Sequence, residues 1–195
     1  MSKQLRAGLA LAAACCAAHA AAPAIEQACF ITPTGMGPIR IGMTLAQAKA
    51  ALPMARFKRS ATGDGVPMVS VLVGRAGDEA GELMDLSADE DDPDKPINWK
   101  RKISVIDTRN PACKTAEGVG PGMLAKKVEK IFGPTKEIEL TEIESREYIE
   151  FKKQPRTLFF QLDNKGIYAK GKNRTRRFEP DASLFKVGVA AASDQ

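Results

Sequence analysis

The chain contains the same short helix-forming pattern twice. The segments GPIRIGMTLAQAKAALP at 37–53 and GVGPGMLAKKVEKIFGP at 118–134 each place a Gly-Met pair before an amphipathic stretch and end at Gly or Pro. Apolar residues at helical spacing predict a short helix after each pair, and the Gly or Pro marks its end. A chain that repeats a helix start eighty residues apart is expected to fold as two related halves.

The first copy carries the stronger helix start. Thr44 and Gln47 have the spacing of a capping box, in which the hydroxyl accepts from an unpaired backbone N–H and the Gln side chain reaches back. Leu124 replaces the capping residue in the second copy, so that start is weaker. The residues predicted to form the two helix starts are Gly42, Met43, Thr44, Gln47, Gly122 and Met123.

Strand-like segments follow each predicted helix. Apolar and polar residues alternate in 100–108 and in 157–163, and DNKG at 163–166 predicts a hairpin turn. A helix followed by antiparallel strands, twice, predicts an α+β fold in which two repeats form one layered domain with the helices on one face of the sheet. The expected organisation is a signal peptide at 1–20, a first helix/β repeat at 21–110, a second repeat at 111–188 and a frayed tail at 189–195.

The first twenty residues have the composition of a secretory signal peptide. Lys3 and Arg6 precede an apolar run too short to span a bilayer, and this run ends in an Ala-x-Ala site at 18–20. We therefore expect an exported protein, periplasmic or secreted. LAAAC weakly resembles a lipobox, so acylation of Cys15 or Cys16 is the alternative, and only then would the chain attach to a membrane.

Cleavage after Ala20 would leave two cysteines, Cys29 and Cys113. An even count in an oxidising compartment predicts one disulfide bond. Closing a loop of that length stabilises a fold by about 4 kcal/mol, because it restricts the unfolded chain. The alternative is two separately buried thiols.

Charge is unevenly distributed in a chain whose net charge is +5. An acidic segment at 78–94 and a basic segment at 170–177 are typical of solvated loops. The acidic segment lacks the glycine and spacing of an EF-hand, and whether it binds a cation stays open. The basic segment has no interleaved aromatic residues, so we do not expect nucleic acid as a partner.

The composition excludes several catalytic classes. The single histidine, His19, lies in the predicted signal peptide, which removes Ser-His-Asp, Cys-His and histidine metal sites from the mature chain. Glu142, Glu144, Glu147 and Glu150 lie on neighbouring predicted strands, so a paired-carboxylate hydrolase is an alternative. Alternating Glu and Lys is typical of a solvated sheet face, which is the interpretation we prefer. We predict no catalytic residue, no metal site and no cofactor.

The stretch IRIGMTLAQAKAAL at 39–52 resembles the Gly-Met-Thr helix signature of two secreted families. These are the small lipoprotein of the outer-membrane β-barrel assembly machinery and the β-lactamase inhibitory protein, which carries the signature twice. The resemblance covers about a dozen residues per copy and includes Gly42, Met43, Thr44 and Gln47. It implies an exported, non-catalytic protein that binds another protein through its sheet and loops.

These observations favour a non-enzymatic protein-binding or inhibitor-like protein, whose partner is another envelope or secreted protein. The alternatives are an envelope assembly accessory, which would be lipid-anchored if Cys15 or Cys16 is acylated, and a carboxylate-based envelope hydrolase. Trp99 would be an interface anchor if exposed and ordinary packing if buried. The candidate protein-binding residues are Trp99, Tyr148, Lys170, Lys172, Arg174, Arg176 and Arg177.

Overall fold

The structure is a computed structural model that describes residues 25–74, 81–88 and 95–191. The predicted signal peptide, Cys15, Cys16 and most of the acidic segment lie outside these residues. Within the described residues, β11-β8-β9-β10-β12-β7-β6-β5-β4 form one antiparallel nine-stranded sheet, and β1-β2-β3 form a small second sheet. The nine strands are β4 (Arg56–Ala61), β5 (Pro67–Val73), β6 (Gly81–Ser87), β7 (Val105–Thr108), β8 (Thr135–Leu140), β9 (Glu147–Phe151), β10 (Leu158–Leu162), β11 (Arg174–Thr175) and β12 (Leu184–Ala190).

The expected α+β layered domain, with helices on one face of the sheet, is wrong. The structure is mostly β, and its helices α1 (Ile25–Ala28), α2 (Leu45–Ala51) and α3 (Ala125–Phe132) are short. Each predicted helix has an apolar stripe of only two or three buried residues, which is too small to cover a nine-stranded sheet. The strands therefore supply most of the core. Among the aromatic contacts, Phe132 of α3 stacks on Phe160 of β10, with ring centroids 5.9 Å apart.

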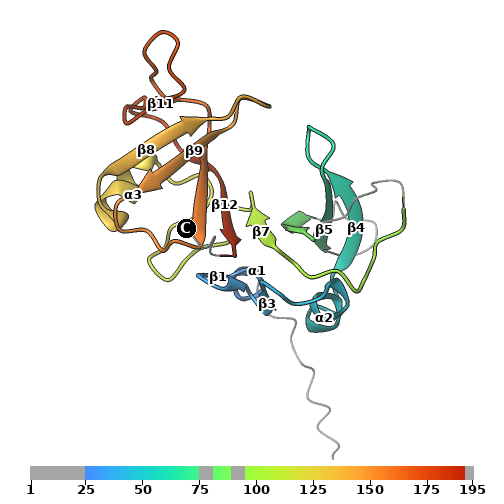
Figure 1. Ribbon diagram of the computed structural model, residues 1–195. Helices are drawn as coiled ribbons and strands as arrows, with labels where there is room; N and C mark the ends of the chain where they lie inside the picture. Colours follow the sequence, from blue (N-terminus) through green and yellow to red (C-terminus); the bar gives the residue numbers. More distant parts are fainter. Residues whose placement is uncertain (1–24, 75–80, 89–94, 192–195) are drawn as a thin grey trace, which may run out of the picture.

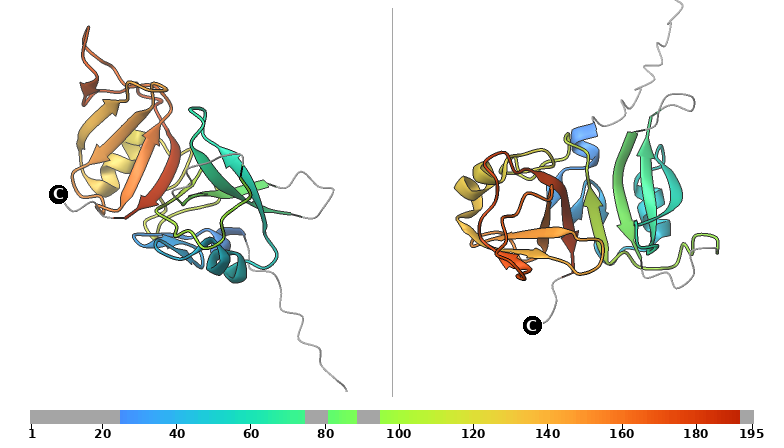
Figure 2. Two further views of the ribbon diagram at one scale, coloured as in Figure 1. Left: turned by 45° about the vertical axis from the view of Figure 1, so that its right-hand side comes forward. Right: turned by 90° about the horizontal axis from the view of Figure 1, so that it is seen from above.

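The order of elements nevertheless occurs twice along the chain. Helix α2 is followed by the antiparallel strands β4 to β7, and α3 is followed by β8, β9, β10 and β12. The last strands of the two sets, β7 and β12, pair with each other and join the two half-sheets into one. Figures 1 and 2 show these two halves on either side of the β7–β12 pair.

The two helices begin where the sequence predicts, with the expected difference between them. Thr44 and Gln47 form the full capping box, with the Gln47 amide donating to Thr44 Oγ1 at 3.2 Å and the Thr44 amide donating to Gln47 Oε1 at 2.8 Å. Leu124 makes no side-chain cap bond. Helix α3 ends at Gly133, whose φ of 79° lies in the left-handed region that favours glycine.

Strand β12 is an element that the sequence analysis did not predict. The expected hairpin at 163–166 is not formed, because β10 pairs with β12, some twenty residues further along the chain. Strand β12 also extends through Ala190, into the segment assigned to a frayed tail, and Val189 is fully buried. Residues 192–195 of that tail lie outside the described residues.

The N-terminal segment contains α1 and the small sheet of β1 (Ile31–Thr32), β2 (Gly35–Met36) and β3 (Ile39–Arg40). The predicted disulfide bond is confirmed: Cys29 and Cys113 are joined, and both are buried. Next to it, the Ile31 amide donates to the Lys114 carbonyl at 2.9 Å. The disulfide therefore ties the segment before α2 to the connection before α3. No helix of the described part of the chain is long and apolar enough to cross a membrane.

The nine-stranded sheet has a core face and an opposite face, which we call the open face. Alternation along β7 places Ile106 on the core face, between Leu86 of β6 and Val189 of β12, and Asp107 on the open face. The largest fully buried side chains of the core are Phe151, Phe160, Ile31, Met36, Ile39, Leu45, Leu83, Met84, Leu86, Ile103, Ile106 and Ile138.

Candidate functional site

Two cross-strand rows of residues define the open face. The first row runs in register through six strands and consists of Lys58, Ser70, Asp85, Asp107, Gly188 and Phe159. The second row runs through five strands and consists of Arg174, Glu139, Tyr148, Gln161 and Lys186. Because each row crosses or reaches the β7–β12 junction, both halves contribute to this surface.

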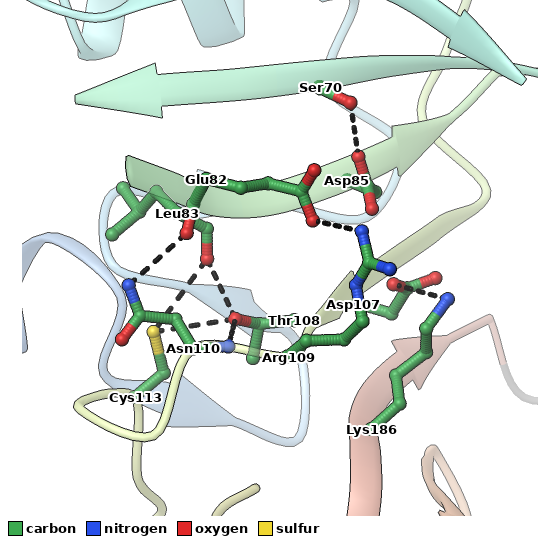
Figure 3. A network of polar contacts seen from close by, with 10 residues as sticks. All are labelled: Ser70, Glu82, Leu83, Asp85, Asp107, Thr108, Arg109, Asn110, Cys113 and Lys186. Carbon is green, nitrogen blue, oxygen red and sulfur yellow. Dashed lines mark hydrogen bonds and ion pairs between the residues drawn. The ribbon is translucent and has the colours of Figure 1, made fainter. Parts of the chain in front are cut away.

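The first row contains two buried carboxylates on adjacent strands. Asp85 is 2% exposed and Asp107 is 8% exposed. Ser70 Oγ donates to Asp85 Oδ1 at 2.6 Å, and Lys186 Nζ lies 3.0 Å from Asp107 Oδ1 (Figure 3). The two acids are therefore held by different partners, one from β5 and one from β12.

Burial sets the electrostatics of this pair. The pKa of Asp85 is raised to about 6, chiefly by removal from water; the hydrogen bond from Ser70 opposes this shift, and the negative charges of Glu82 and Asp107 add to it. Burial also raises the pKa of Asp107, an effect that the charge of Lys186 opposes. The centre of the open face thus holds acids that ionise less readily than exposed ones.

A second group of polar contacts fixes the connection that leaves β7 (Figure 3). Thr108 Oγ1 donates to the Leu83 carbonyl at 2.7 Å, and Asn110 Nδ2 donates to the Glu82 carbonyl at 3.2 Å. Arg109 pairs with the Glu82 side chain at 2.6 Å, and this hydrogen bond raises the pKa of the guanidinium. These contacts hold the disulfide-bearing connection against β6.

A pocket of about 340 Å³ lies on the open face between the two halves. Its lining includes the aromatic side chains of Tyr148 and Phe159, which meet edge to face with ring centroids 6.1 Å apart. A Cβ at Gly188 would lie 2.0 Å from the Phe159 ring, so this glycine is what lets the ring lie over β12. The full lining is Thr62, Asp64, Val66, Met68, Ser87, Val105, Asp107, Arg146, Tyr148, Phe159 and Lys186.

Besides the Lys186–Asp107 pair, an ion-pair contact between two turns joins the halves across the open face. Asp64, in the turn between β4 and β5, lies 3.4 Å from Arg146, in the turn between β8 and β9. Arg146 also pairs with Glu144 of its own turn. A hydrogen bond from Thr62 lowers the pKa of Asp64, and the charge of Arg146 lowers it further. We call the Asp64–Arg146–Glu144 contact the clasp, and its two turns approach each other in Figures 1 and 2.

The predicted protein-binding residues separate into three places. Tyr148 lies on the open face and lines the pocket. Trp99 is half-buried against Phe57 at 6.1 Å, with Lys49 Nζ 4.6 Å from its ring centroid, so it packs beside α2 and not in the pocket. The basic residues lie at the β11 end of the sheet. Arg174 pairs there with Glu137 and Glu139, and Arg176 Nε donates to the Lys136 carbonyl. The remaining basic candidates, Lys170, Lys172 and Arg177, are exposed.

The four glutamates considered for hydrolysis do not gather at the pocket. Glu144 pairs with Arg146, and Glu150 pairs with Lys136 at 2.8 Å. Glu147 is buried and accepts the Gly166 amide, while Glu142 is exposed. Among the described residues, no group of His, Cys, Asp and Glu side chains is arranged to hold a metal ion.

Sequence reasoning missed the acids and the lysine at the centre of the open face. Asp85 and Asp107 each interrupt an apolar strand, in LMDL and VIDT, and Lys186 lies in a strand that was not predicted. A lone Asp inside an apolar strand was the available signal, because such a residue must be paired when it is buried. The three residues come together only because β6 pairs with β7 and β7 pairs with β12, and these strand pairings cannot be read from the sequence.

Comparisons with known proteins place the fold but not the function. No protein-family model matches the chain, and no curated protein sequence matches it. A solved structure, the uncharacterized protein yfeY from Escherichia coli, is similar in fold with a TM-score of 0.53. The two chains are 14% identical over 83% of this chain and 99% of that one. At this identity the likeness concerns the fold alone.

Proposed function

We propose that this chain is an exported, non-enzymatic protein-binding or inhibitor-like protein that contacts its partner through the open face. The observation that carries the proposal is one surface built by both halves, with an aromatic-lined pocket at its centre. Tyr148 and Arg146 belong to the residue types that dominate interface hot spots, and both line this pocket. The short helix signature that resembles two protein-binding families agrees with this function.

Exposed apolar side chains flank the pocket. Val66 lies in the β4–β5 turn and is 51% exposed, and Ile143 lies in the β8–β9 turn and is 70% exposed. These are the two turns that meet at the clasp. Apolar residues at the tips of loops, beside a pocket with polar partners, form a pattern typical of protein interfaces.

The arrangement of carboxylates favours binding over hydrolysis. Glycoside hydrolysis needs two carboxyl groups on either side of the scissile bond. Asp85 is almost completely buried and hydrogen-bonded to Ser70, so only Asp107 of the adjacent pair lines the pocket. Asp107 is in turn engaged by Lys186, and Asp64, the other carboxylate of the lining, is engaged by Arg146. This geometry supports a recognition surface better than a pair of catalytic acids.

Photo-cross-linking from the open face tests the proposal. A photoreactive phenylalanine at Gln161, in the second row, is expected to yield one specific adduct with a protein of the native compartment. The same residue at Lys127, exposed on α3, is the control and is expected to yield none. Equal adducts from both positions, or an adduct from Lys127 alone, would exclude the open face as the interface.

A further inference from the structure

The nine-stranded sheet ends in two edge strands, β11 and β4, which are covered differently. At one end, β11 pairs with two residues of β8. The neighbouring backbone groups of β8 are also engaged, because Arg176 Nε donates to the Lys136 carbonyl at 2.8 Å and the Leu140 amide donates to the Asn173 carbonyl at 2.8 Å. The segment around β11 therefore closes that edge. At the other end lies β4, the outermost strand of the first half in Figure 1.

Strand β4 has a row of backbone groups that point outward from the sheet. Its residues pair with β5 in one unbroken register, and the Thr62 amide continues this ladder by donating to the Val66 carbonyl at 2.9 Å. Because hydrogen-bonded pairs alternate along an antiparallel ladder, the N–H and C=O groups of Phe57 and Ala61 point away from β5. In the part of the chain that the structure describes, no hydrogen bond engages these groups. They can pair with another strand.

The two faces of β4 carry different side chains. Lys58 belongs to the first row of the open face, and Arg56 lies on the same face two residues earlier. Both are exposed, and neither has an ion-pair partner among the described residues. On the core face, Phe57 packs against the half-buried Trp99, with ring centroids 6.1 Å apart. A strand beside β4 would therefore meet two positive charges on one face and an aromatic pair on the other.

This inference rests on the proposed function and names the form in which the partner binds. We propose that the partner protein adds an extended, acidic segment to the edge of β4, antiparallel to it. Acidic and apolar residues alternate in this segment, so that carboxylates lie opposite Arg56 and Lys58 and apolar side chains extend the Phe57–Trp99 contact. Strand addition to an exposed sheet edge gives affinity through main-chain hydrogen bonds and specificity through alternate side chains.

Charge favours this occupant over a second copy of the chain. Two antiparallel β4 strands would bring Arg56 and Lys58 of both copies together on one face, and like charges across paired strands are destabilising. Lysine on an edge strand is a common device against such self-association. An acidic segment meets attraction at the same positions. The β4–β5 turn lines the pocket of the open face, so a strand bound to β4 would adjoin that surface.

Model peptides test the inference without the partner. The probe is a short acetylated and amidated peptide that alternates glutamate and valine. In the proposed pairing its valines lie opposite Phe57 and Ala61 and their amides donate to β4, while the glutamate amides point to solvent. N-methylation of the valines is therefore expected to weaken binding at least about tenfold, because several hydrogen bonds are lost. N-methylation of the glutamates is the matched control and is expected to change Kd by less than about threefold.

A second pair of experiments tests the charges. A peptide that alternates lysine and valine is expected to bind at least about tenfold more weakly than the probe. The double variant Arg56→Gln, Lys58→Gln is expected to weaken binding of the probe about three- to tenfold. Lys170→Gln, Lys172→Gln removes two lysines of the same spacing at the β11 end of the sheet, and it is expected to leave Kd within about twofold. All four side chains are exposed, so both variants are expected to fold.

Hydrogen exchange followed by NMR locates the binding. At saturating probe, exchange of the Phe57 and Ala61 amides is expected to slow at least about tenfold, because each gains a hydrogen-bond acceptor. If exchange of both amides is already slow before the probe is added, the edge is covered by the chain itself or by a second copy, and the inference is overturned.

Two further results would overturn the added strand. One is an equal effect of N-methylation at the valines and at the glutamates, and the other is equal affinity for the lysine–valine peptide and the probe. Such a failure is separate from failure of the proposed function. A protein adduct from Gln161 with no binding of the probe would retain the open face as an interface and remove only the strand at β4.

Discussion

Gly42 and Gly122 occupy equivalent positions in the two halves of the protein. Their φ angles are 85° and 81°, in the left-handed region that glycine adopts without strain. The Gly42 amide donates to the Ile103 carbonyl at 2.8 Å, and the Gly122 amide donates to the Leu184 carbonyl at 2.7 Å. Each glycine therefore turns its chain into a helix and pairs it with the last strand region of its own half.

Replacing either glycine by alanine is expected to destabilise the fold by about 1 kcal/mol, because a Cβ is unfavourable at positive φ. No atom lies within 4 Å of a Cβ built at either position, so the cost is one of backbone conformation alone. Urea unfolding measures it. Gly81→Ala is the matched control, since Gly81 has equal space and no positive φ. If the Gly42 and Gly122 variants lose no more stability than Gly81→Ala, positive φ is not what makes these two glycines necessary.

Thr44→Ala is expected to cost about 1 kcal/mol in free energy of unfolding, because it removes the hydroxyl that caps α2. Leu124→Ala, at the same place in the second half, removes no cap bond. It is expected to cost less than Thr44→Ala, in parallel chemical denaturation. A larger cost at Leu124 would show that capping does not distinguish the two helix starts.

Asp85 is expected to make stability depend on pH. Its pKa of about 6 in the folded protein exceeds the value of about 3.9 in an unfolded chain, so protonation favours the folded state. Its contribution is full, at about 3 kcal/mol, only well below pH 4; about 2 kcal/mol of it is present at pH 4 and is lost as pH rises through about 6. Asp85→Asn removes this dependence. The free energy of unfolding of the variant, relative to that of the unmutated protein, is therefore expected to rise by about 2 kcal/mol between pH 4 and pH 8.

Urea unfolding of both proteins across this pH range provides the measurement. The difference between them, followed against pH, cancels any constant effect of the substitution on packing. Asp181→Asn is the control, because that carboxylate is exposed and its pKa is lowered by Lys165. A constant difference for Asp85→Asn at every pH would mean that burial does not perturb this acid.

Reduction of the Cys29–Cys113 disulfide is expected to lower the free energy of unfolding by about 4 kcal/mol, because 84 residues separate the two cysteines. The test is urea unfolding with and without dithiothreitol. The double variant Cys29→Ser, Cys113→Ser is the control and should be insensitive to the reductant. Equal stability of the oxidised and reduced protein would contradict the prediction.

Local patterns predicted the features that depend on neighbouring residues. The capping box at Thr44, the helix stop at Gly133 and the glycine turns at 42 and 122 each follow from a few adjacent side chains. The disulfide followed from the count of two cysteines in a chain expected to be exported. These elements need no knowledge of which strands pair.

The sheet could not be predicted in the same way, because its pairing is not local. Strand β4 begins at Arg56 and its alternating charged residues do not form a recognisable apolar pattern. Strand β12 contains Gly188 and Lys186, and it joins β10 to β7 across large sequence separations. The two buried acids, the pocket and the clasp all depend on these pairings. The sequence therefore indicated Tyr148 as a candidate contact but not the surface that surrounds it.

The affinity of the cross-linked partner for variants of the open face tests the central claim most directly. Tyr148→Ala is expected to weaken binding at least about tenfold, because it removes an aromatic side chain from the centre of the interface. Lys127→Ala, on the exposed face of α3, is expected to leave Kd within about twofold, as is usual away from an interface. Unchanged affinity in Tyr148→Ala, with a loss in Lys127→Ala, would contradict the claim that the open face is the binding surface.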